Sequence, residues 1–256
     1  MTGSSAIGSV QVLGTAVFST HHASAHDVLA EQDRPFTSPT YGLLVGRARR
    51  FTSLVTQMHI EVCGALNVDP GQLSAAVFAT CHGEIQTAEK LIADFREASM
   101  VSSARFAMSV HNTPSGVYSV ATGSHAPTTT VTGANAIAAG WLEAALAALD
   151  LDAGRTVLLS IADEPVPAVF QGPAGQVGVA AAFLLGPASA GGGQIGRRAQ
   201  LALVPAAPSD GEVDALQVLA RAADASTGDA AAVIALGPIQ LGAALELRFP
   251  AKEVRP

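Results

Sequence analysis

Apolar and polar residues follow two rhythms along this chain: the two-residue period of strands and the three- to four-residue period of helices. Between residues 47 and 66, apolar side chains recur at mostly three- and four-residue spacings, which predicts an amphipathic helix with a basic start. Strands are predicted at 10–20, 73–79, 128–132, 156–162, 177–185, 199–204 and 244–249. Helices are predicted at 47–66, 84–95, 116–121, 134–149 and 212–223, and residues 21–41 are expected to form a loop with a short helix.

The order of these elements predicts an α/β layer fold in one domain, residues 1–256. Strands alternate with helices and are followed by two consecutive strands, which favours a mixed sheet with helices on its faces. The segment 134–149 is apolar nearly all round, so its helix is expected to be buried. The segment 186–198 contains Gly191, Gly192 and Gly193 without the spacing or lysine of a phosphate-binding loop, so it is interpreted as a flexible linker.

Composition narrows the function classes. Charged residues make up only 14% of the 256, against roughly 25% in ordinary soluble domains, which is a first indication of an oligomer. The net charge of -7 argues against nucleic acid as the main partner, because phosphate binding needs a concentrated basic face. No apolar run approaches the roughly 20 residues of a membrane span, and the first residues lack a signal-peptide pattern, so we expect a cytoplasmic protein.

Cysteine and histidine offer the sharpest candidate chemistry. Cys63 and Cys81 make neither a disulfide framework nor a zinc site. Cys81 and His82 follow a predicted strand and could form a nucleophilic dyad with His111, although free cysteine is more often a buried packing residue. His111 and Asn112 could face a pocket or close a turn through side-chain to backbone hydrogen bonds.

Two further clusters of side chains could either bind a ligand or partner or simply be exposed to solvent. His22 and His26 are four residues apart and, with His21, could hold a metal on a helix, but a loop or solvated face is favoured, so no metal is predicted. Arg47, Arg49 and Arg50 could contact an acidic partner or carrier protein through bidentate arginine contacts, or form a solvated helix end. No motif indicates a cofactor.

Three sequence blocks resemble the β-ketoacyl-synthase-like N-terminal-domain family, whose members are often labelled chain-length factors. The blocks are VFATCHGE at 77–84, FAMSVHNTPSG at 106–116 and DEPVP at 163–167. The resemblance extends from about residue 47 to about residue 185. It implies a thiolase-like half, with a single mixed sheet of the five-stranded type and helices on its faces, lacking the second ketosynthase half. Thiolase folds usually dimerise by pairing sheet edges, with the nucleophile helix near the interface.

The stretch TVTGANA at 130–136 matches the nucleophile elbow of active ketosynthases. There, the family's cysteine sits at a helix N-terminus, where free amides and the helix dipole favour the thiolate. The resemblance places Asn135 at that position, between Ala134 and Ala136, and a carboxamide cannot form a thioester. The two C-terminal histidines of active ketosynthases are also missing, because no histidine follows His125.

The expected function is therefore a noncatalytic ketosynthase-like subunit of the chain-length-factor type. It would pair with an active β-ketoacyl synthase, shape the acyl pocket and work with an acyl carrier protein in fatty-acid, polyketide or aryl-polyene-like synthesis. Asn135, Ala134, Ala136, His111, Asn112, Cys81 and His82 are the pocket or interface candidates. The alternatives are a stand-alone thioester-processing enzyme using Cys81, His82 or His111, and a homodimeric acyl-binding scaffold.

Overall fold

One mixed sheet forms the centre of the protein. The computed structural model describes residues 4–40, 42–44, 46, 52–170, 177–188, 196–206, 214–240 and 243–252. Within them, eight strands pair in the order β3-β2-β4-β5-β1-β6-β8-β7. The strands are β1 (Ser5–Ser19), β2 (Leu73–Thr80), β3 (Thr128–Thr132), β4 (Thr156–Asp163), β5 (Val179–Pro187), β6 (Arg197–Pro205), β7 (Ala232–Gln240) and β8 (Ala243–Phe249).

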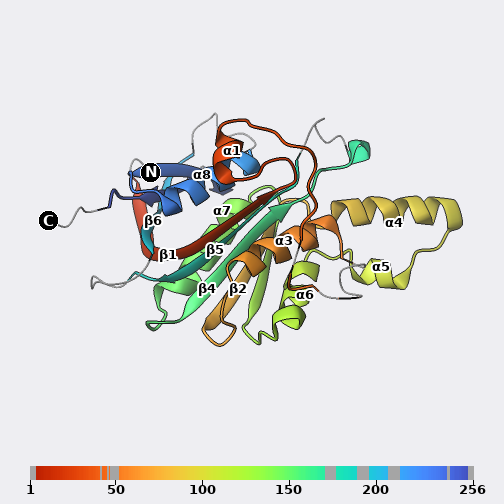
Figure 1. Cartoon of the computed structure of the whole chain (residues 1–256), viewed down its shortest axis with the longest axis horizontal. Coiled ribbons are helices and arrows are strands. Elements are labelled where there is room, and N and C mark those ends of the chain that lie inside the picture. The colour runs from red at the N-terminus through yellow and green to blue at the C-terminus, as the bar shows by residue number, and fades with distance from the viewer. Residues whose placement is uncertain are drawn as a thin grey trace.

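The helices lie on both faces of the sheet. They are α1 (Ala25–Leu29), α3 (Leu54–Ala65), α4 (Ile85–Ala98), α5 (Ser103–Ala107), α6 (Thr113–Thr122), α7 (Ala136–Leu149) and α8 (Ala215–Thr227), with a 3-10 turn η1 (Ala168–Phe170). Helices α7 and α8 pack with the larger hydrophobic cluster on one face, and α3 and α6 pack with a second cluster on the other. Figure 1 shows α3 in front of the sheet and α7 behind it.

Close contact between α7 and the sheet depends on small and aromatic residues. Gly140 faces β2 so tightly that an added Cβ would lie 2.8 Å from the Cβ of Ala79. At the next residue, the ring of Trp141 packs against Phe183 of β5, with ring centroids 4.7 Å apart. The helix is buried along most of its length, as its apolar sequence predicts.

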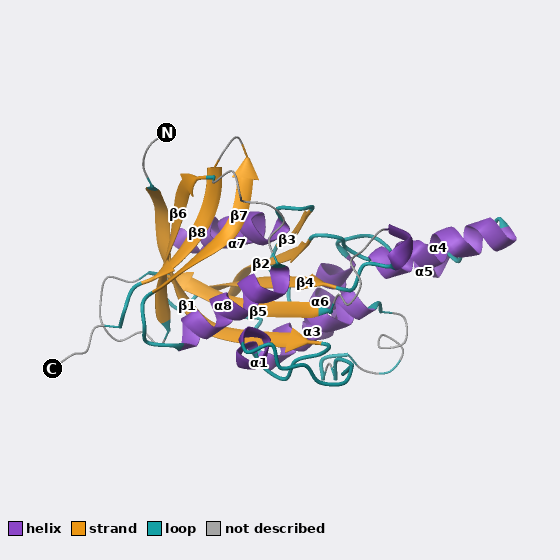
Figure 2. Cartoon of the chain, turned by 90° about the horizontal axis from the view of Figure 1, so that it is seen from above, coloured by secondary structure: helices purple, strands orange, loops and turns teal. Residues whose placement is uncertain are grey.

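The sheet is parallel at one end and antiparallel at the other. Strand β2 pairs in parallel with both β3 and β4, whereas every other pair is antiparallel. Figure 2 shows β6, β8 and β7 turning away from the direction of β4 and β5, as the right-handed twist accumulates across a wide sheet. Because β2, β3 and β4 run in the same direction, the loops that follow them all leave from the C-terminal ends of these strands, on one side of the sheet.

The sequence-based element pattern is largely confirmed, with three corrections. The family resemblance implied a sheet of the five-stranded type, whereas the described residues form eight strands, because β6, β8 and β7 extend the sheet by antiparallel pairing. The pattern missed β7, where Gly237 and Pro238 interrupt the apolar run; this strand tolerates them because it lies at the sheet edge and its register shifts at both places. The predicted helix at 47–66 is described from Leu54, and residues 47–51 lie outside the described part.

Helices α4 and α5 form a projection, residues 85–107, which we call the arm. Figure 2 shows it extending away from the sheet. Of the residues of α4, only Leu91 is buried, and an ion pair between Arg105 and Asp94 joins the two helices. The arm leaves several large apolar side chains exposed, which are Ile92, Phe95, Met100, Val101 and Phe106. None of the described helices has the length and apolar character needed to cross a membrane.

A buried arginine holds the antiparallel end together. Arg197, at the start of β6, is only 4% exposed and donates hydrogen bonds to the carbonyl oxygens of Gly228, Ala230 and Pro250. Its guanidinium also lies 5.3 Å from the ring centroid of Phe249. The side chain thereby joins the end of α8, the start of β7 and the end of β8.

We expect Arg197→Met to lower the free energy of unfolding by about 2–3 kcal/mol, because the charged hydrogen bonds that the buried guanidinium donates to three backbone carbonyl groups are lost. Urea unfolding followed by the fluorescence of Trp141, the single tryptophan, measures this change. Arg198→Met is the matched control: its side chain is exposed, so the change should stay within about 0.5 kcal/mol. Equal losses in the two variants would contradict the role of Arg197.

Candidate functional site

A sharp turn between β3 and α7 forms the elbow, residues 132–136. Gly133 has φ of +106°, a conformation that L side chains rarely adopt, and this reverses the chain between strand and helix. The amide of Ala136 donates to the carbonyl of Gly133 at 2.9 Å and closes the turn. Ala134 and Asn135 are exposed, while Ala136 is buried. The strand–turn–helix predicted at 130–136 is therefore present.

Asn135 occupies the N-cap position of α7 but makes no side-chain cap hydrogen bond. Its Nδ2 instead donates to the backbone carbonyl of Ile239 in β7, at 3.1 Å. This contact links the elbow to the edge strand of the antiparallel end, 104 residues further along the chain. The carboxamide thus acts as a tether between the two ends of the sheet.

The loop after β2 lies beside the elbow. Thr80 and Thr132 are register partners at the ends of β2 and β3, so Cys81 and Gly133 leave adjacent strands together. An added Cβ on Gly83 would lie 3.4 Å from the Cβ of His111, which places the start of the α6 turn against this loop. The structure therefore brings Cys81, His82, His111 and Asn135 to the side of the sheet where the parallel strands β2 and β3 end.

Asp163 anchors the loop after β2. Its Oδ1 accepts hydrogen bonds from the hydroxyl of Thr80 at 2.9 Å and from the amides of Cys81 and His82 at 2.8 and 3.1 Å. Thr80 Oγ1 in turn accepts from the amide of Gly83 at 2.8 Å. The sequence places Asp163 at a strand end but gives no sign of this role. Its oxygens are committed to holding the loop rather than free for acid or base chemistry.

Two buried glutamates lie behind the loop. Glu164 accepts from the amides of Val55 and Gln86, at 3.2 and 2.9 Å, and Glu84 accepts from the hydroxyl of Thr56 at 2.6 Å. Burial raises the pKa of both carboxyl groups, and the pKa of Glu164 reaches about 7 because nearby Glu84 adds repulsion. Local sequence patterns do not indicate this pair, since its hydrogen-bond partners lie on α3 and α4.

The two cysteines differ in environment. Cys63 is fully buried, and desolvation raises its pKa to about 12, which rules out a thiolate there near neutral pH. Cys81 is half-buried and packs against the larger hydrophobic cluster. His59, also fully buried, bonds Ser160 through Nδ1 at 2.8 Å, and desolvation lowers its pKa to about 3, so its ring is neutral.

His111 and Asn112 are exposed at the start of α6. The turn closes through the backbone carbonyl of Asn112, which accepts from the hydroxyl of Ser115 at 2.8 Å and from the amide of Gly116 at 3.2 Å. The side chain of Asn112 makes no cap hydrogen bond.

The N-terminal histidines hold a loop. His22 lies before α1, so it does not share a helix face with His26. Its Nδ1 bonds the hydroxyl of Ser19 and its Nε2 contacts the carboxylate of Asp33, both at 3.0 Å. No group of three or more His, Cys, Asp or Glu residues that could hold a metal occurs in the described ranges. The candidate contacts Arg47, Arg49 and Arg50 lie outside those ranges.

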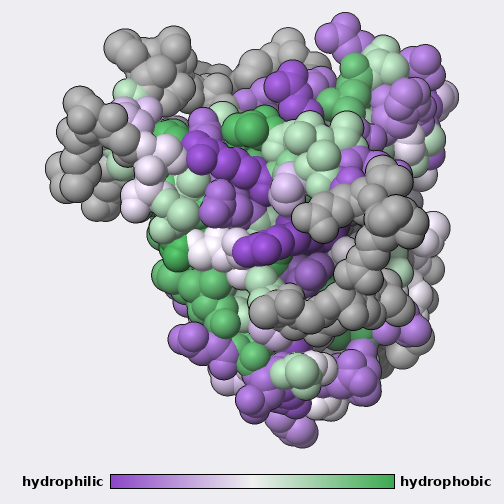
Figure 3. Space-filling model, turned by 90° about the vertical axis from the view of Figure 1, so that its left-hand side faces the viewer, coloured by the Kyte–Doolittle hydropathy of each residue, from purple (hydrophilic) through white to green (hydrophobic). Residues whose placement is uncertain are grey.

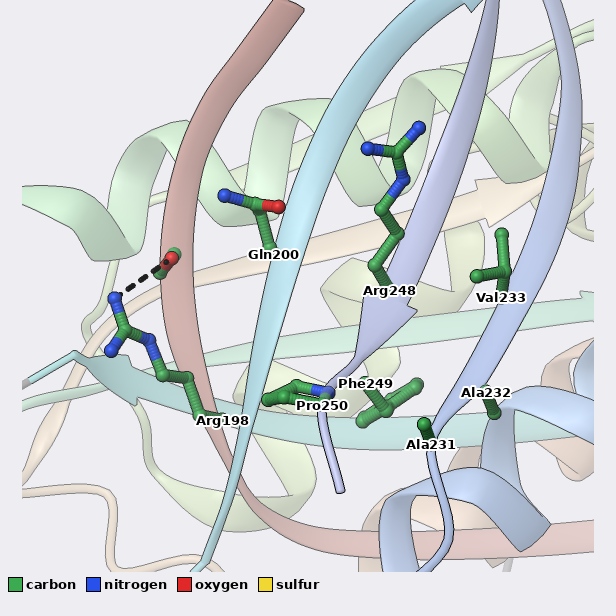
Figure 4. Close-up of a pocket in the computed structure, with 9 residues that line it drawn as sticks. Arg198, Gln200, Ala231, Ala232, Val233, Arg248, Phe249 and Pro250 are labelled. Atoms are coloured by element: carbon green, nitrogen blue, oxygen red, sulfur yellow. Dashed lines mark hydrogen bonds between the residues drawn. The ribbon is translucent and has the colours of Figure 1, made fainter. Parts of the chain in front are cut away.

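Two cavities of about 410 Å³ lie away from the elbow. One is on the antiparallel end, lined by residues that include Ser9, Arg198 and Arg248. Figure 4 shows Arg198 and Gln200 on β6 and Arg248 on β8. Figure 3 shows hydrophilic side chains gathered on this side of the molecule. The other includes His125 and Arg155. The elbow in this single chain is thus part of neither cavity.

Comparison with protein families gives one match. The model for the beta-ketoacyl synthase, N-terminal domain, matches residues 23–233. The chain belongs to this family. The match extends beyond the 47–185 region of sequence resemblance; it includes the elbow, the loop after β2 and helix α8, and it ends at the second residue of β7. Comparison with curated proteins finds no match for this ketosynthase-like chain.

Solved structures share the fold of this ketosynthase-like chain at low sequence identity. One is the ketosynthase ApeO in complex with its chain length factor ApeC from Xenorhabdus doucetiae, with 16% identity, a TM-score of 0.70 and coverage of 94% of this chain and 99% of the matched chain. The ishigamide ketosynthase/chain length factor matches with 12% identity, a TM-score of 0.68 and coverage of 95% and 99%.

A third structure contains a type II polyketide synthase acyl-carrier protein in complex with its ketosynthase; it matches with 13% identity, a TM-score of 0.67 and coverage of 96% and 100%. The twelfth ketosynthase of the bacillaene polyketide synthase from Bacillus amyloliquefaciens has 12% identity and a TM-score of 0.52. There the match covers 78% of this chain but 46% of the ketosynthase chain.

We expect Asn135→Ala to lower the free energy of unfolding by about 1 kcal/mol, because the carbonyl of Ile239 loses its donor. Asn135→Asp should cost more, since a carboxylate cannot donate and would face a carbonyl oxygen. Asn112→Ala is the control, because that side chain also makes no cap hydrogen bond. Chemical unfolding measures the three variants, and an Asn135→Ala protein as stable as the parent would argue against the tether.

Proposed function

We propose that this chain is a noncatalytic, chain-length-factor-type subunit that pairs with an active β-ketoacyl synthase and shapes its acyl pocket. The observation that carries this proposal is Asn135, at the elbow where the family resemblance places the nucleophile. Its carboxamide is hydrogen-bonded to Ile239 of the same chain. A condensing enzyme needs an ionisable thiol at this point, and a carboxamide offers none.

The remaining chemistry of a ketosynthase is also missing from this sequence. Active ketosynthases use two C-terminal histidines to bind the thioester carbonyl and promote decarboxylation, and the last histidine here is His125. Of the described histidines, His59 is buried and neutral, and His22 is bonded in its loop. These observations support a subunit that contributes shape and contacts while its partner supplies catalysis.

The two sheet edges support pairing through β3. At one edge, β7 contains Gly237, Pro238 and two register shifts, all of which discourage further strand pairing. At the other edge, β3 has the sequence TTTVT, without proline, charge or bulge, and its residues are exposed or half-buried. A second chain could add a strand there, which would place the elbow beside the junction.

The arm adds an apolar surface on the same half of the protein. Phe95 is 59% exposed and Phe106 is 61% exposed, although large aromatic side chains are usually well buried in soluble domains. The arm continues from the loop after β2, which lies beside the elbow. Contact with a ketosynthase would bury these side chains, and the low fraction of charged residues fits such an interface.

An acyl carrier protein would complete the assembly. Arg47, Arg49 and Arg50 are proposed contacts for its acidic surface, because arginine pairs well with carboxylates and phosphates. His111, Asn112, Cys81 and His82 remain proposed pocket or interface residues, since they lie along the same edge as the elbow.

We expect the double variant Phe95→Asp/Phe106→Asp to lose association with its ketosynthase while the isolated subunit stays folded. Two carboxylates would have to be desolvated in an apolar contact, which should weaken binding at least a hundredfold. Co-expression with candidate ketosynthases of the same genome, followed by size-exclusion chromatography, gives the measurement.

Val233→Asp is the matched control. Val233 is 65% exposed on β7, at the opposite edge of the sheet, so its variant should still bind. If the parent protein and every candidate ketosynthase elute separately, pairing is wrong. A stable homodimer indifferent to ketosynthases would support the scaffold alternative.

We expect Asn135→Cys to restore a thiol without producing a condensing enzyme, because the histidine pair remains absent. Incubation with acyl and malonyl carrier protein, followed by mass spectrometry, should show no decarboxylation or chain extension above the level of the parent protein.

The same assay separates the enzyme alternative. The parent protein should accumulate no acyl adduct at Cys81 with an acyl-thioester probe. Rapid acylation of Cys81 that disappears in His111→Ala would support a stand-alone thioester-processing enzyme, and condensation by Asn135→Cys would contradict the noncatalytic assignment.

A further inference from the structure

The arm joins the rest of the protein where α4 begins. A helix N-terminus presents amides that its own backbone cannot satisfy, and these need outside acceptors. Glu84 at the N-cap of α4 makes no side-chain cap hydrogen bond. The amide of Gln86 instead reaches Glu164 Oε1 at 2.9 Å, and the Gln86 side chain donates from Nε2 to the carbonyl of Pro165 at 3.0 Å. Both contacts fix the arm to the segment that follows β4.

We propose that Glu164 is a positioning residue that sets the direction of the arm by bridging the N-termini of α3 and α4. Its second oxygen, Oε2, accepts from the amide of Val55 in the first turn of α3, at 3.2 Å. Helix α3 is packed in the core through seven buried residues, so it provides a fixed base. One carboxylate, 3% exposed, thus connects the projecting helix to a rigid one.

The negative charge of Glu164 strengthens this bridge and also makes it sensitive to pH. A carboxylate between two helix N-termini is favoured by both helix dipoles and by the amide hydrogen bonds. Desolvation and the neighbouring Glu84 oppose the charge and raise the pKa of Glu164 to about 7, while Lys90 of α4 lowers it. The adjacent Asp163 directs its oxygens to the loop after β2. The bridge therefore changes protonation near neutral pH.

Protonation should loosen the arm while stabilising the protein as a whole. A protonated carboxyl group is neutral and keeps one good acceptor oxygen, so both amides lose a charged partner and one of them loses a good acceptor as well. The folded pKa lies above the ordinary 4.5, so the contribution of this group to the free energy of unfolding falls as pH rises from about 4.5 to about 7. The arm, in contrast, is held best above pH 7. As pH rises towards 7, the free energy of unfolding should fall while the arm is held more tightly. These opposite changes distinguish a local effect on α4 from a change in global stability.

Hydrogen–deuterium exchange of the isolated subunit tests the bridge. In Glu164→Gln, amides in the first half of α4 should exchange on the order of tenfold faster, as expected for loss of a charge-assisted hydrogen bond. Peptides from α7 should be unchanged. The control is Glu97→Gln, which removes an exposed carboxylate from the last turn of the same helix and should leave α4 exchange unaltered. In the parent protein, α4 should exchange faster at pH 6 than at pH 8 after correction for intrinsic rates.

Unchanged α4 exchange in Glu164→Gln relative to Glu97→Gln overturns the proposal. If Glu164→Gln does not fold, the pH comparison on the parent protein decides: equal corrected exchange at pH 6 and pH 8 overturns it. A consequence for partner binding rests on the proposed function, and there Glu164→Gln should weaken ketosynthase association at pH 8. Failure of the parent protein to bind any ketosynthase contradicts the proposed function alone, because the exchange measurement needs no partner.

Discussion

The parallel strands β2, β3 and β4 end side by side, and the loops that leave them must find partners for their backbone groups close to a hydrophobic core. An unpaired buried amide costs about as much as a lost hydrogen bond. Two adjacent acidic residues at the end of β4 meet this requirement. Asp163 accepts from the loop after β2, and Glu164 accepts from the first turns of α3 and α4. The positions of the loop after β2 and of the arm depend on these four oxygens.

The elbow solves the same problem in another way. Gly133 allows the sharp turn, and the chain closes it with its own backbone. Because the side chain of Asn135 does not cap α7, it is available to hold β7. In a working ketosynthase, the residue at this point must stay free to attack a thioester. A tether to Ile239 is compatible with the elbow geometry but not with that freedom, which is why the proposed loss of chemistry and the proposed structural duty fit together.

Local patterns in the sequence predict much of this fold and little of the polar site. The strand at 128–132 is recognisable because its β-branched residues prefer an extended conformation, and the helix at 134–149 because its apolar residues are buried as the pattern requires. Strand β7 is not, because Gly237 and Pro238 are tolerated only through register shifts at a sheet edge. The bond from Asn135 to Ile239 spans 104 residues, and that from Val55 to Glu164 spans 109, so no local pattern contains them.

The contrast between the two ends of the sheet supports an asymmetric use of the surface. At the antiparallel end, Arg197 ties three chain segments together, and the face beside it presents polar side chains such as Arg198 and Gln200. That end presents an edge strand, β7, whose Gly237, Pro238 and two register shifts make it unsuited to further pairing. At the parallel end, an unprotected strand, an apolar arm and an elbow outside both cavities lie together. A chain with so few charges gains most by burying that end, which is why the proposed pairing with a ketosynthase is placed there rather than at the antiparallel end.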